Sequence, residues 1–381
     1  MSTMPLRLAM VAGETSGDLL AGLLLGGLLE RWPQVQMQGI GGPRMLAQGF
    51  ETWWPQDKLA VRGYVEVLWH YREISSIREA LARRLIADPP RAFIGVDAPD
   101  FNLGLEARLR ARGIKTIHFV CPSIWAWRGG RAQKMATSCD HVLCLFPFEP
   151  ALLQAHGVAA TFVGHPMADA IALNVPRRAA REHLQVKQDE TLIAVLPGSR
   201  RSEIAAIAPV FLQAVSRLQR QRKDLRFVLP VAGGLREMLE PLVQAHAPGA
   251  HLQLLDGQSH TALAACDITL IASGTATLEA ALFKRPMVIG YRMNPLTWQI
   301  MKRLRYQPWV GLPNILCRDF VVPELIQENC TPETLTKAVL AGLDDHESHR
   351  NINLRFTELH HQLRCNTARQ ATDVIAQIVA H

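Results

Sequence analysis

Short apolar segments alternate along this chain with longer segments in which apolar residues recur at helical spacing. The apolar segments end at glycine or polar turns, which is typical of parallel strands that are buried on both faces and joined by helices. The predicted strands are residues 6–12, 36–40, 92–96, 115–120 and 141–145 in a first series, and 191–196, 226–231, 252–255, 268–272 and 286–290 in a second. Helices are predicted within the first series at residues 19–31, 73–86 and 103–112.

The two series predict an α/β protein with two Rossmann-like, doubly wound domains that face a cleft. We expect residues 1–175 to form the first domain and 190–345 the second, because Pro176 and a cluster of charges interrupt the apolar pattern between them. Residues 346–381 carry apolar positions at helical spacing, and we expect this tail to cross back onto the first domain or onto a partner chain.

Composition narrows the classes of partner. Of the 381 residues 48% are hydrophobic and 20% charged, and the net charge of +7 favours an anionic partner such as a nucleotide, a sugar phosphate or a membrane surface. The basic residues do not form one stripe, which argues against nucleic acid. Seven scattered cysteines without zinc-site spacing indicate a reduced, cytosolic protein. The apolar run at residues 19–29 is too short to span a bilayer, so any membrane contact would be peripheral.

Two turns of the first domain carry carboxylates. The strand at 6–12 leads into Gly13, Glu14 and Ser16 at the start of a helix, where small residues let a sugar or an anion approach closely. Because Glu14 would repel a pyrophosphate, a sugar hydroxyl is the expected neighbour. A plain strand-to-helix turn is the alternative.

The second of these turns follows the strand at 92–96 and holds Asp97 and Asp100. Ligands of open α/β sheets bind at such strand ends, and a carboxylate there can accept the proton of an attacking sugar hydroxyl. Asp97 is the first candidate for this base and Asp100 the second. A helix N-cap is the alternative role for Asp100.

A third motif combines Trp125, Trp127 and Arg128. Tryptophan faces stack on sugar rings and a guanidinium holds phosphate through paired donors, although interdomain packing is an equal alternative for either tryptophan. Among the nearby histidines, His165 is interpreted as a structural hydrogen-bonding group, with contact to substrate at the domain junction as the alternative. His118 is interpreted as a core residue, and a surface position is expected for His260.

Two turns of the second domain suit a nucleotide. Ser199 and Arg200 follow the strand at 191–196 and can clamp phosphate through backbone N–H groups and a cation. The alternative is that Arg201 and Glu203 are simply solvated charges at the helix start. After the strand at 268–272 a helix begins with small hydroxylated residues and continues to an acid that can accept both ribose hydroxyls: Ser273, Gly274, Thr275 and Glu279.

Together these motifs resemble the lipid-A-disaccharide synthase family, which are inverting glycosyltransferases of the two-Rossmann GT-B type. The resemblance spans nearly the whole chain and rests on residues 11–18, 95–102, 123–128, 196–200, 273–279 and 312–314. It implies that Asp97 corresponds to the catalytic base and that Arg200, Glu279 and Asn314 belong to the UDP site. The sequence departs from the family at Cys121, where serine is usual, and at Arg62 and Trp69.

The resemblance further implies the substrates: UDP-2,3-diacylglucosamine as donor, and 2,3-diacylglucosamine 1-phosphate (lipid X) as acceptor. The products would be UDP and the β-1,6-linked lipid A disaccharide 1-phosphate. No cofactor or metal is expected, because Arg200 and the helix start at 273–277 offset the charge of the leaving UDP, and the chain lacks a carboxylate pair suited to magnesium.

The acylated substrates that the resemblance implies would require contact with a membrane, and we expect this to be the anionic cytoplasmic face of the inner membrane of a Gram-negative-type bacterium. The segment 61–85 mixes apolar, aromatic and basic residues, and its predicted membrane-facing residues are Tyr64, Val65, Leu68, Trp69 and Arg72. A core-packed helix with a solvated basic face is the alternative, and residues 296–309 are a second candidate. A homodimer through the C-terminal helix is also a candidate assembly.

Two other functions remain open from sequence. The same two-domain frame serves a UDP-N-acetylglucosamine 2-epimerase, and a nucleotide-sugar sensor would bind without turnover. A sensor would need Asp97 only for affinity.

Overall fold

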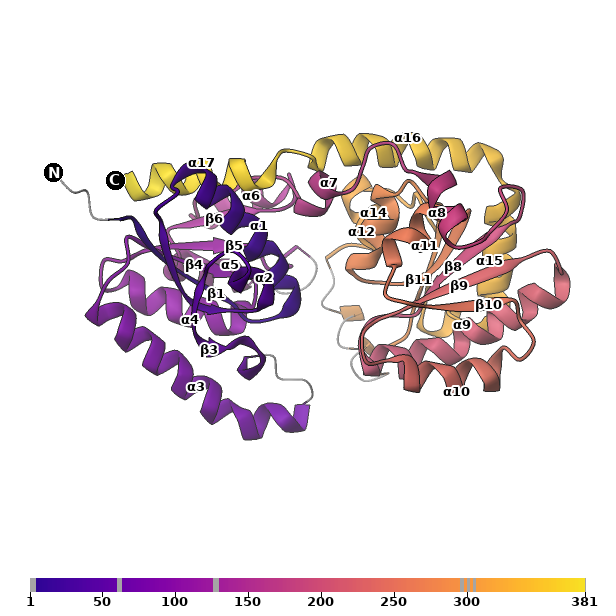
Figure 1. Cartoon of the computed structure of the whole chain (residues 1–381), viewed down its shortest axis with the longest axis horizontal. Coiled ribbons are helices and arrows are strands. Elements are labelled where there is room, and N and C mark those ends of the chain that lie inside the picture. The colour runs from indigo at the N-terminus through magenta and orange to yellow at the C-terminus, as the bar shows by residue number, and fades with distance from the viewer. Residues whose placement is uncertain are drawn as a thin grey trace. The chain divides into compact units, whose positions relative to one another are not determined.

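The computed structural model describes residues 5–59, 64–125, 130–294, 298–299, 302–303 and 306–380, with the side chains of 15 and 64–71 left aside. The chain forms two compact units (Figure 1). Unit 1 consists of Met1–Asp169 together with Leu363–His381, and unit 2 is Ala170–Gln362. Each unit is built on its own parallel sheet, as the two series of apolar segments predict.

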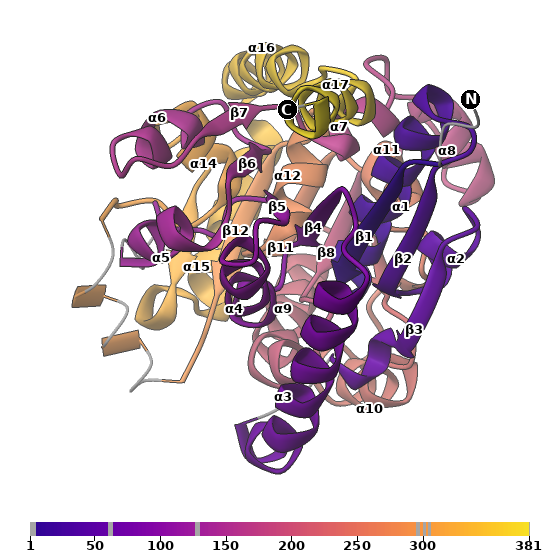
Figure 2. The same cartoon turned by 90° about the vertical axis from the view of Figure 1, so that its left-hand side faces the viewer.

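Unit 1 holds a seven-stranded sheet in the order β3-β2-β1-β4-β5-β6-β7. The strands are β1 (Arg7–Ala12), β2 (Gln36–Gly41), β3 (Glu51–Pro55), β4 (Ala92–Val96), β5 (Lys115–Phe119), β6 (His141–Cys144) and β7 (Ala160–Phe162). The helices are α1 (Thr15–Arg31), α2 (Pro43–Leu46), α3 (Tyr64–Ala87), α4 (Pro99–Arg110), α5 (Gly130–Ser138), α6 (Glu149–Gln154), α7 (Pro166–Ala170) and α17 (Thr367–Ala380). Figure 2 shows α3 and α4 in front of this sheet.

The two faces of β1 explain its uninterrupted apolar sequence. Leu8 and Met10 pack in one core cluster with α1 and α17. Ala9 and Val11 pack in another with α3 and α4. Both sides of the strand are therefore covered, so successive residues are all apolar.

Helix α17 is an integral part of unit 1. A Cβ on Gly27 of α1 would lie 2.8 Å from the carbonyl oxygen of Ala368, so glycine allows the two helices to approach closely. The carboxylate of Asp169 accepts the N–H groups of Asn366 and Thr367, at 2.9 and 2.7 Å, and thereby caps the start of α17.

Unit 2 holds a six-stranded parallel sheet in the order β10-β9-β8-β11-β12-β13. The strands are β8 (Leu192–Leu196), β9 (Arg226–Val231), β10 (Leu252–Asp256), β11 (Ile268–Ala272), β12 (Met287–Tyr291) and β13 (Glu324–Ile326). The helices are α8 (Arg177–His183), α9 (Arg201–Gln221), α10 (Arg236–His246), α11 (Ser259–Ala265), α12 (Thr275–Leu282), α14 (Leu312–Cys317), α15 (Pro332–Asp344) and α16 (His346–Leu363). Short 3-10 turns occur at Gln56–Lys58 and Gln327–Asn329.

The helical tail is divided between the two units. Nearly all of α16 belongs to unit 2 and α17 to unit 1, and the earlier division between the units falls after Asp169, ahead of the break predicted between residues 175 and 190. No helix of the described residues combines the length and the apolar character needed to cross a bilayer.

Candidate functional site

In each sheet the strand order reverses between two neighbouring strands, and ligands of open α/β sheets bind at the carboxyl ends of such strands. The reversal lies between β1 and β4 in unit 1, and between β8 and β11 in unit 2. The turns that follow these four strands are the ones the sequence marks by Glu14, Asp97, Arg200 and Thr275. Two candidate subsites result, one in each unit.

In unit 1 the turns after β1 and β4 touch. A Cβ on Gly13 would lie 3.1 Å from the Cβ of Ala98, so a larger residue would push the turns apart. Glu14 and Ser16 are exposed. Gln56, which the sequence did not single out, donates to the carbonyl oxygens of Ala12 and Glu14 at 3.1 and 2.7 Å and fixes the turn that presents Glu14.

Asp97 and Ala98 both adopt the left-handed backbone conformation, with φ values of 51° and 43°. The N–H of Asp97 donates to the carbonyl oxygen of Phe119 at 2.9 Å. The side chain is half-buried, and its carboxylate has no hydrogen bond or ion pair with any other described residue. This carboxylate is therefore open to a substrate hydroxyl.

The interpretation of Asp100 as a helix N-cap is wrong. Ala98 is the N-cap of α4, Pro99 is the first residue of the helix and Asp100 is the second. The Asp100 carboxylate is 85% exposed and receives Nη2 of Arg131 at 2.8 Å, so it holds a cation beside the Asp97 turn.

Trp125 is packed within unit 1. Its indole N–H donates to Oε1 of Glu149 at 3.0 Å, and its ring meets Phe146 and Phe148 edge-on. Burial raises the pKa of Glu149 to about 8. His165 stacks on Phe146 and accepts the N–H of Met167 at 3.2 Å, a structural role as expected. Burial lowers the pKa of His165 to about 4.

The predictions for Trp127 and Arg128 lie outside the described residues. His118 is fully buried, which confirms its interpretation as a core residue.

In unit 2 the carboxylate of Glu203 accepts the backbone N–H groups of the turn after β8, the groups predicted from the sequence to bind a phosphate. Its Oε2 accepts the N–H groups of Ser199 and Arg200, at 3.0 and 3.3 Å, so these donors are already engaged. The interpretation of Glu203 as a solvated charge is therefore wrong: it closes a capping box at the start of α9. The guanidinium of Arg200 is 74% exposed, 3.1 Å from Oε1 of Glu203, and it is the group of this turn that can reach a phosphate.

The turn after β11 leaves an open helix start. Gly274 is the N-cap of α12 and no side chain caps the helix. Gly274 and Thr275 are exposed, whereas the Ser273 hydroxyl donates to the carbonyl oxygen of Val310 at 3.3 Å. The free N–H groups and the helix dipole favour an anion here.

Glu279 lies on α12 beyond these N–H groups and pairs with Nε2 of His260 at 3.3 Å. This hydrogen bond raises the pKa of His260. The sequence missed the contact, because the pair joins two helices, α11 and α12. No group of three or more His, Cys, Asp or Glu side chains within the described part of the chain is arranged to hold a metal.

Asn314 is fully buried. Its amide nitrogen donates to the carbonyl oxygen of Val322 at 2.8 Å and to Oε1 of Glu324 at 2.9 Å, and its oxygen accepts the N–H of Val322 at 3.0 Å. All its polar atoms are engaged, so Asn314 shapes the neighbouring loop rather than offering an open amide.

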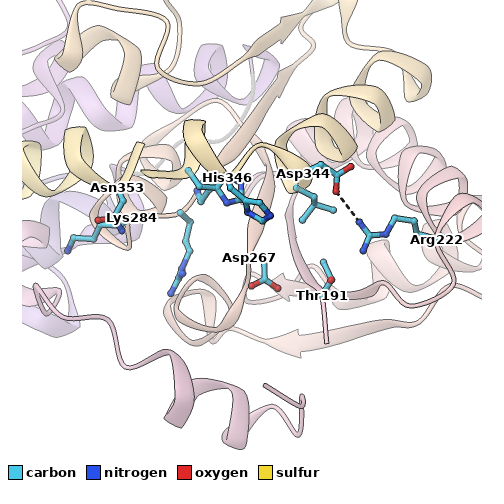
Figure 3. Close-up of a pocket in the computed structure, with 11 residues that line it drawn as sticks. Thr191, Arg222, Asp267, Lys284, Asp344, His346 and Asn353 are labelled. Carbon is cyan, nitrogen blue, oxygen red and sulfur yellow. Dashed lines mark ion pairs between the residues drawn. The ribbon is translucent and has the colours of Figure 1, made fainter. Parts of the chain in front are cut away.

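A cavity of about 480 Å³ lies at the opposite edge of the unit 2 sheet (Figure 3). Thr191, Asp267 and Pro286 line it, and each precedes a strand instead of following one. Asp267 pairs with Arg177 and Arg181, both at 2.7 Å. The carboxylate of Asp267 in this cavity is thus engaged in ion pairs that stabilise the fold. We therefore place the candidate site at the carboxyl ends of the strands.

Comparison with known proteins gives consistent matches. A family model described as lipid-A-disaccharide synthetase matches residues 8–378. The lipid-A-disaccharide synthase of Verminephrobacter eiseniae is 56% identical over 382 residues, which cover 99% of this chain and 98% of that protein.

Two solved structures share the fold. The calicheamicin glycosyltransferase CalG4 has a TM-score of 0.65 at 13% identity, covering 99% of both chains. The UDP-N-acetylglucosamine 2-epimerase of Neisseria meningitidis has a TM-score of 0.62 at 10% identity, covering 98% of this chain and 100% of that one. At these identities the likeness shows a GT-B type fold, and that fold serves both transferases and epimerases.

Proposed function

The chain belongs to the lipid-A-disaccharide synthase family, glycosyltransferases of lipid A biosynthesis, and we propose a division of roles between its two units. Unit 1 binds the acceptor, 2,3-diacylglucosamine 1-phosphate, and supplies the base. Unit 2 binds the donor, UDP-2,3-diacylglucosamine. The single observation that carries this proposal is the open carboxylate of Asp97 at the strand-order reversal of unit 1.

Asp97 removes the proton of the acceptor 6-hydroxyl while that oxygen attacks the anomeric carbon of the donor. The bond from this carbon to the UDP oxygen breaks with inversion, and a β-1,6 linkage forms. Glu14, exposed on the adjacent turn, hydrogen-bonds an acceptor hydroxyl. The ion pair of Asp100 with Arg131 lies beside Asp97 and places a cation next to the acceptor site.

The leaving UDP gains negative charge, and unit 2 offers two positive features to stabilise it. One is the exposed guanidinium of Arg200, and the other is the uncapped start of α12 at Gly274 and Thr275. Glu279 accepts the ribose hydroxyls from its place on α12. With these groups carrying the charge, the proposed mechanism uses no metal.

We also place the protein peripherally on the cytoplasmic face of the inner membrane, because both proposed substrates are acylated. The side chains of Tyr64, Val65, Leu68 and Trp69 lie outside the described residues, and Arg72 is exposed. Farther along α3, apolar residues such as Ile77 and Leu81 pack in the core, so docking would use the beginning of the helix. Because α17 packs within its own chain, a homodimer through this helix stays a prediction.

The decisive test is turnover of the two proposed substrates in detergent micelles with EDTA. We expect disaccharide and UDP from the wild type. Asp97→Asn should lower kcat by about 10²–10⁴-fold, the usual contribution of a general base. Asp88→Asn is the matched control, because its carboxylate is also exposed and pairs with Arg7 at the start of β1, away from the site, and it should retain most of the turnover.

Each of the other outcomes has a distinct meaning. If the wild type forms no disaccharide, the assignment of these two substrates is wrong. If the wild type converts the donor into an epimer, the alternative function of a 2-epimerase is favoured. An Asp97→Asn variant with normal kcat would leave the reaction in place and move the base elsewhere.

A further inference from the structure

The backbone that carries Asp97 is strained. Asp97 and Ala98 are consecutive non-glycine residues in the left-handed region, at φ 51° and 43°. The left-handed conformation is unfavourable for residues that carry a Cβ, so it persists only where the surroundings hold it. The contacts that hold this turn therefore decide where the Asp97 carboxylate points.

One buried side chain makes the principal contact. Asn102, on α4, is fully buried, and its Nδ2 donates to the carbonyl oxygen of Asp97 at 2.8 Å. The same nitrogen lies 3.4 Å from the carbonyl oxygen of Val96 and 3.3 Å from that of Val11. A single amide thus ties together the ends of β4 and β1 and the strained peptide that follows β4.

Behind Asn102 lies a buried ionisable pair that the proposed chemistry does not use. Glu106, also on α4, and His118, on β5, are both fully buried, with Oε1 and Nδ1 2.8 Å apart. Burial raises the pKa of Glu106. Burying ionisable groups is unfavourable unless their geometry and hydrogen bonds compensate, so an apolar pair would pack this helix on the sheet at a lower cost in stability.

Gly95 connects this pair to the base. It is the β4 partner of His118, and a Cβ at this position would overlap Oε1 of Glu106 and lie 2.9 Å from the Cβ of Asn102. The residue after His118 is Phe119, whose carbonyl oxygen accepts the N–H of Asp97. The pair therefore fixes α4 against the two strands that hold the Asp97 turn.

We propose that Asn102 is a positioning residue for the reaction, and that the Glu106–His118 pair keeps α4 in the place from which Asn102 holds the Asp97 carbonyl. This inference rests on the proposed role of Asp97 as the base. Relaxation of the turn toward a right-handed conformation would move the carboxylate, and a displacement of about 1 Å in a reacting group costs on the order of 10²-fold in rate.

The test is a double-mutant cycle on steady-state kinetics with radiolabelled acceptor. Asn102→Ala should lower kcat by about 10–100-fold, with KM for both substrates nearly unchanged. In an Asp97→Asn background the same substitution should have little further effect, because Asn102 acts only through Asp97. Glu106→Ala should behave like Asn102→Ala, whereas Glu106→Gln, which keeps a hydrogen bond to His118, should restore most of kcat.

Thr116→Val is the matched control for damage to the fold. Thr116 is fully buried at the other end of β5, and its hydroxyl donates to the carbonyl oxygen of Ser138 and to Asp140. We expect it to lower Tm without lowering kcat. Asn102→Ser, which retains a donor at this position, gives a second variant if Asn102→Ala does not fold.

The inference is overturned if a folded Asn102 variant keeps normal kcat, raises KM instead, or loses as much activity in the Asp97→Asn background as in the wild type. Full turnover by Asp97→Asn would overturn the assignment of the base as well, so the two failures are distinguishable.

Discussion

Arg181 offers the sharpest test of how unit 2 is held together. This arginine of α8 is fully buried, and its guanidinium donates to the carbonyl oxygens of Ala265, Lys187, Gln188 and Glu190 and to the carboxylate of Asp267. The bonds to Ala265, Lys187, Glu190 and Asp267 measure 2.9, 2.6, 2.8 and 2.7 Å. They join α8 to the segments that lead into β8 and β11.

Arg181→Met keeps most of the side-chain volume and removes every one of these donors. The carbonyl oxygens of Ala265, Lys187 and Glu190 lose their donor, and each acceptor left unsatisfied costs about 1–3 kcal/mol, whereas Asp267 keeps its ion pair with Arg177; we therefore expect a loss of about 4 kcal/mol in all. At an m-value of about 2 kcal/mol/M, a loss of 4 kcal/mol lowers the urea midpoint by about 2 M. Amide hydrogen exchange should rise in β8 and β11, with that of β1 and β4 unchanged, since the latter strands belong to unit 1.

Arg177→Met is the matched control. Arg177 donates to the same Asp267 at 2.7 Å, but its side chain is 36% exposed, so its loss should cost at most about 1 kcal/mol. Equal midpoints for the two variants, or a midpoint for Arg181→Met within about 0.3 M of the wild type, would refute the reasoning.

Two further predictions concern the donor subsite. The pKa of His260 is raised by Glu279, so the stability that this pair gives is fully present below the ordinary histidine pKa of about 6.5 and is lost as the pH rises through the raised value. In thermal melts, the difference in stability between the wild type and His260→Ala should therefore shrink from pH 6 toward pH 9; a constant difference would contradict the pairing. Gly198→Ala would place a Cβ 2.6 Å from Oε2 of Glu203 at φ 123°, so calorimetry should show weaker UDP binding, whereas Gly234→Ala, with open space around it, should bind UDP normally.

The sequence predicts the central strands and the edge strand β10, but it misses the other three edge strands. Residues 92–96 are predicted as the strand that the structure has as β4, because that strand is apolar throughout and buried on both faces. The strands β3, β7 and β13 were missed. Each lies at an edge of its sheet and has at most one buried residue, and β7 and β13 have only three residues, so the apolar signal on which the prediction depends is weak.

For the candidate site, the sequence locates the turns but not what holds them. Glu203 could have been recognised, since an acid three residues after Arg200 fits the N3 position of a capping box. Two of the contacts join residues on different elements, 42 and 12 positions apart: Gln56 with Glu14, and Glu106 with His118. No local sequence pattern predicts such contacts. Asn102 lies at a core position of α4, where the amide is distinguished only by the carbonyl groups that it meets.

The insertion of unit 2 within unit 1 bears on how the protein is made. Ala371 and Ile375 of α17 complete the core beside α1, yet they leave the ribosome only after all of unit 2 has been synthesised. Unit 2 can therefore fold before unit 1 is complete. Until α17 is synthesised, the apolar face of α1 that α17 covers stays exposed. During translation, the apolar face of α1 is therefore the surface of unit 1 that stays open to non-native contacts until α17 is made.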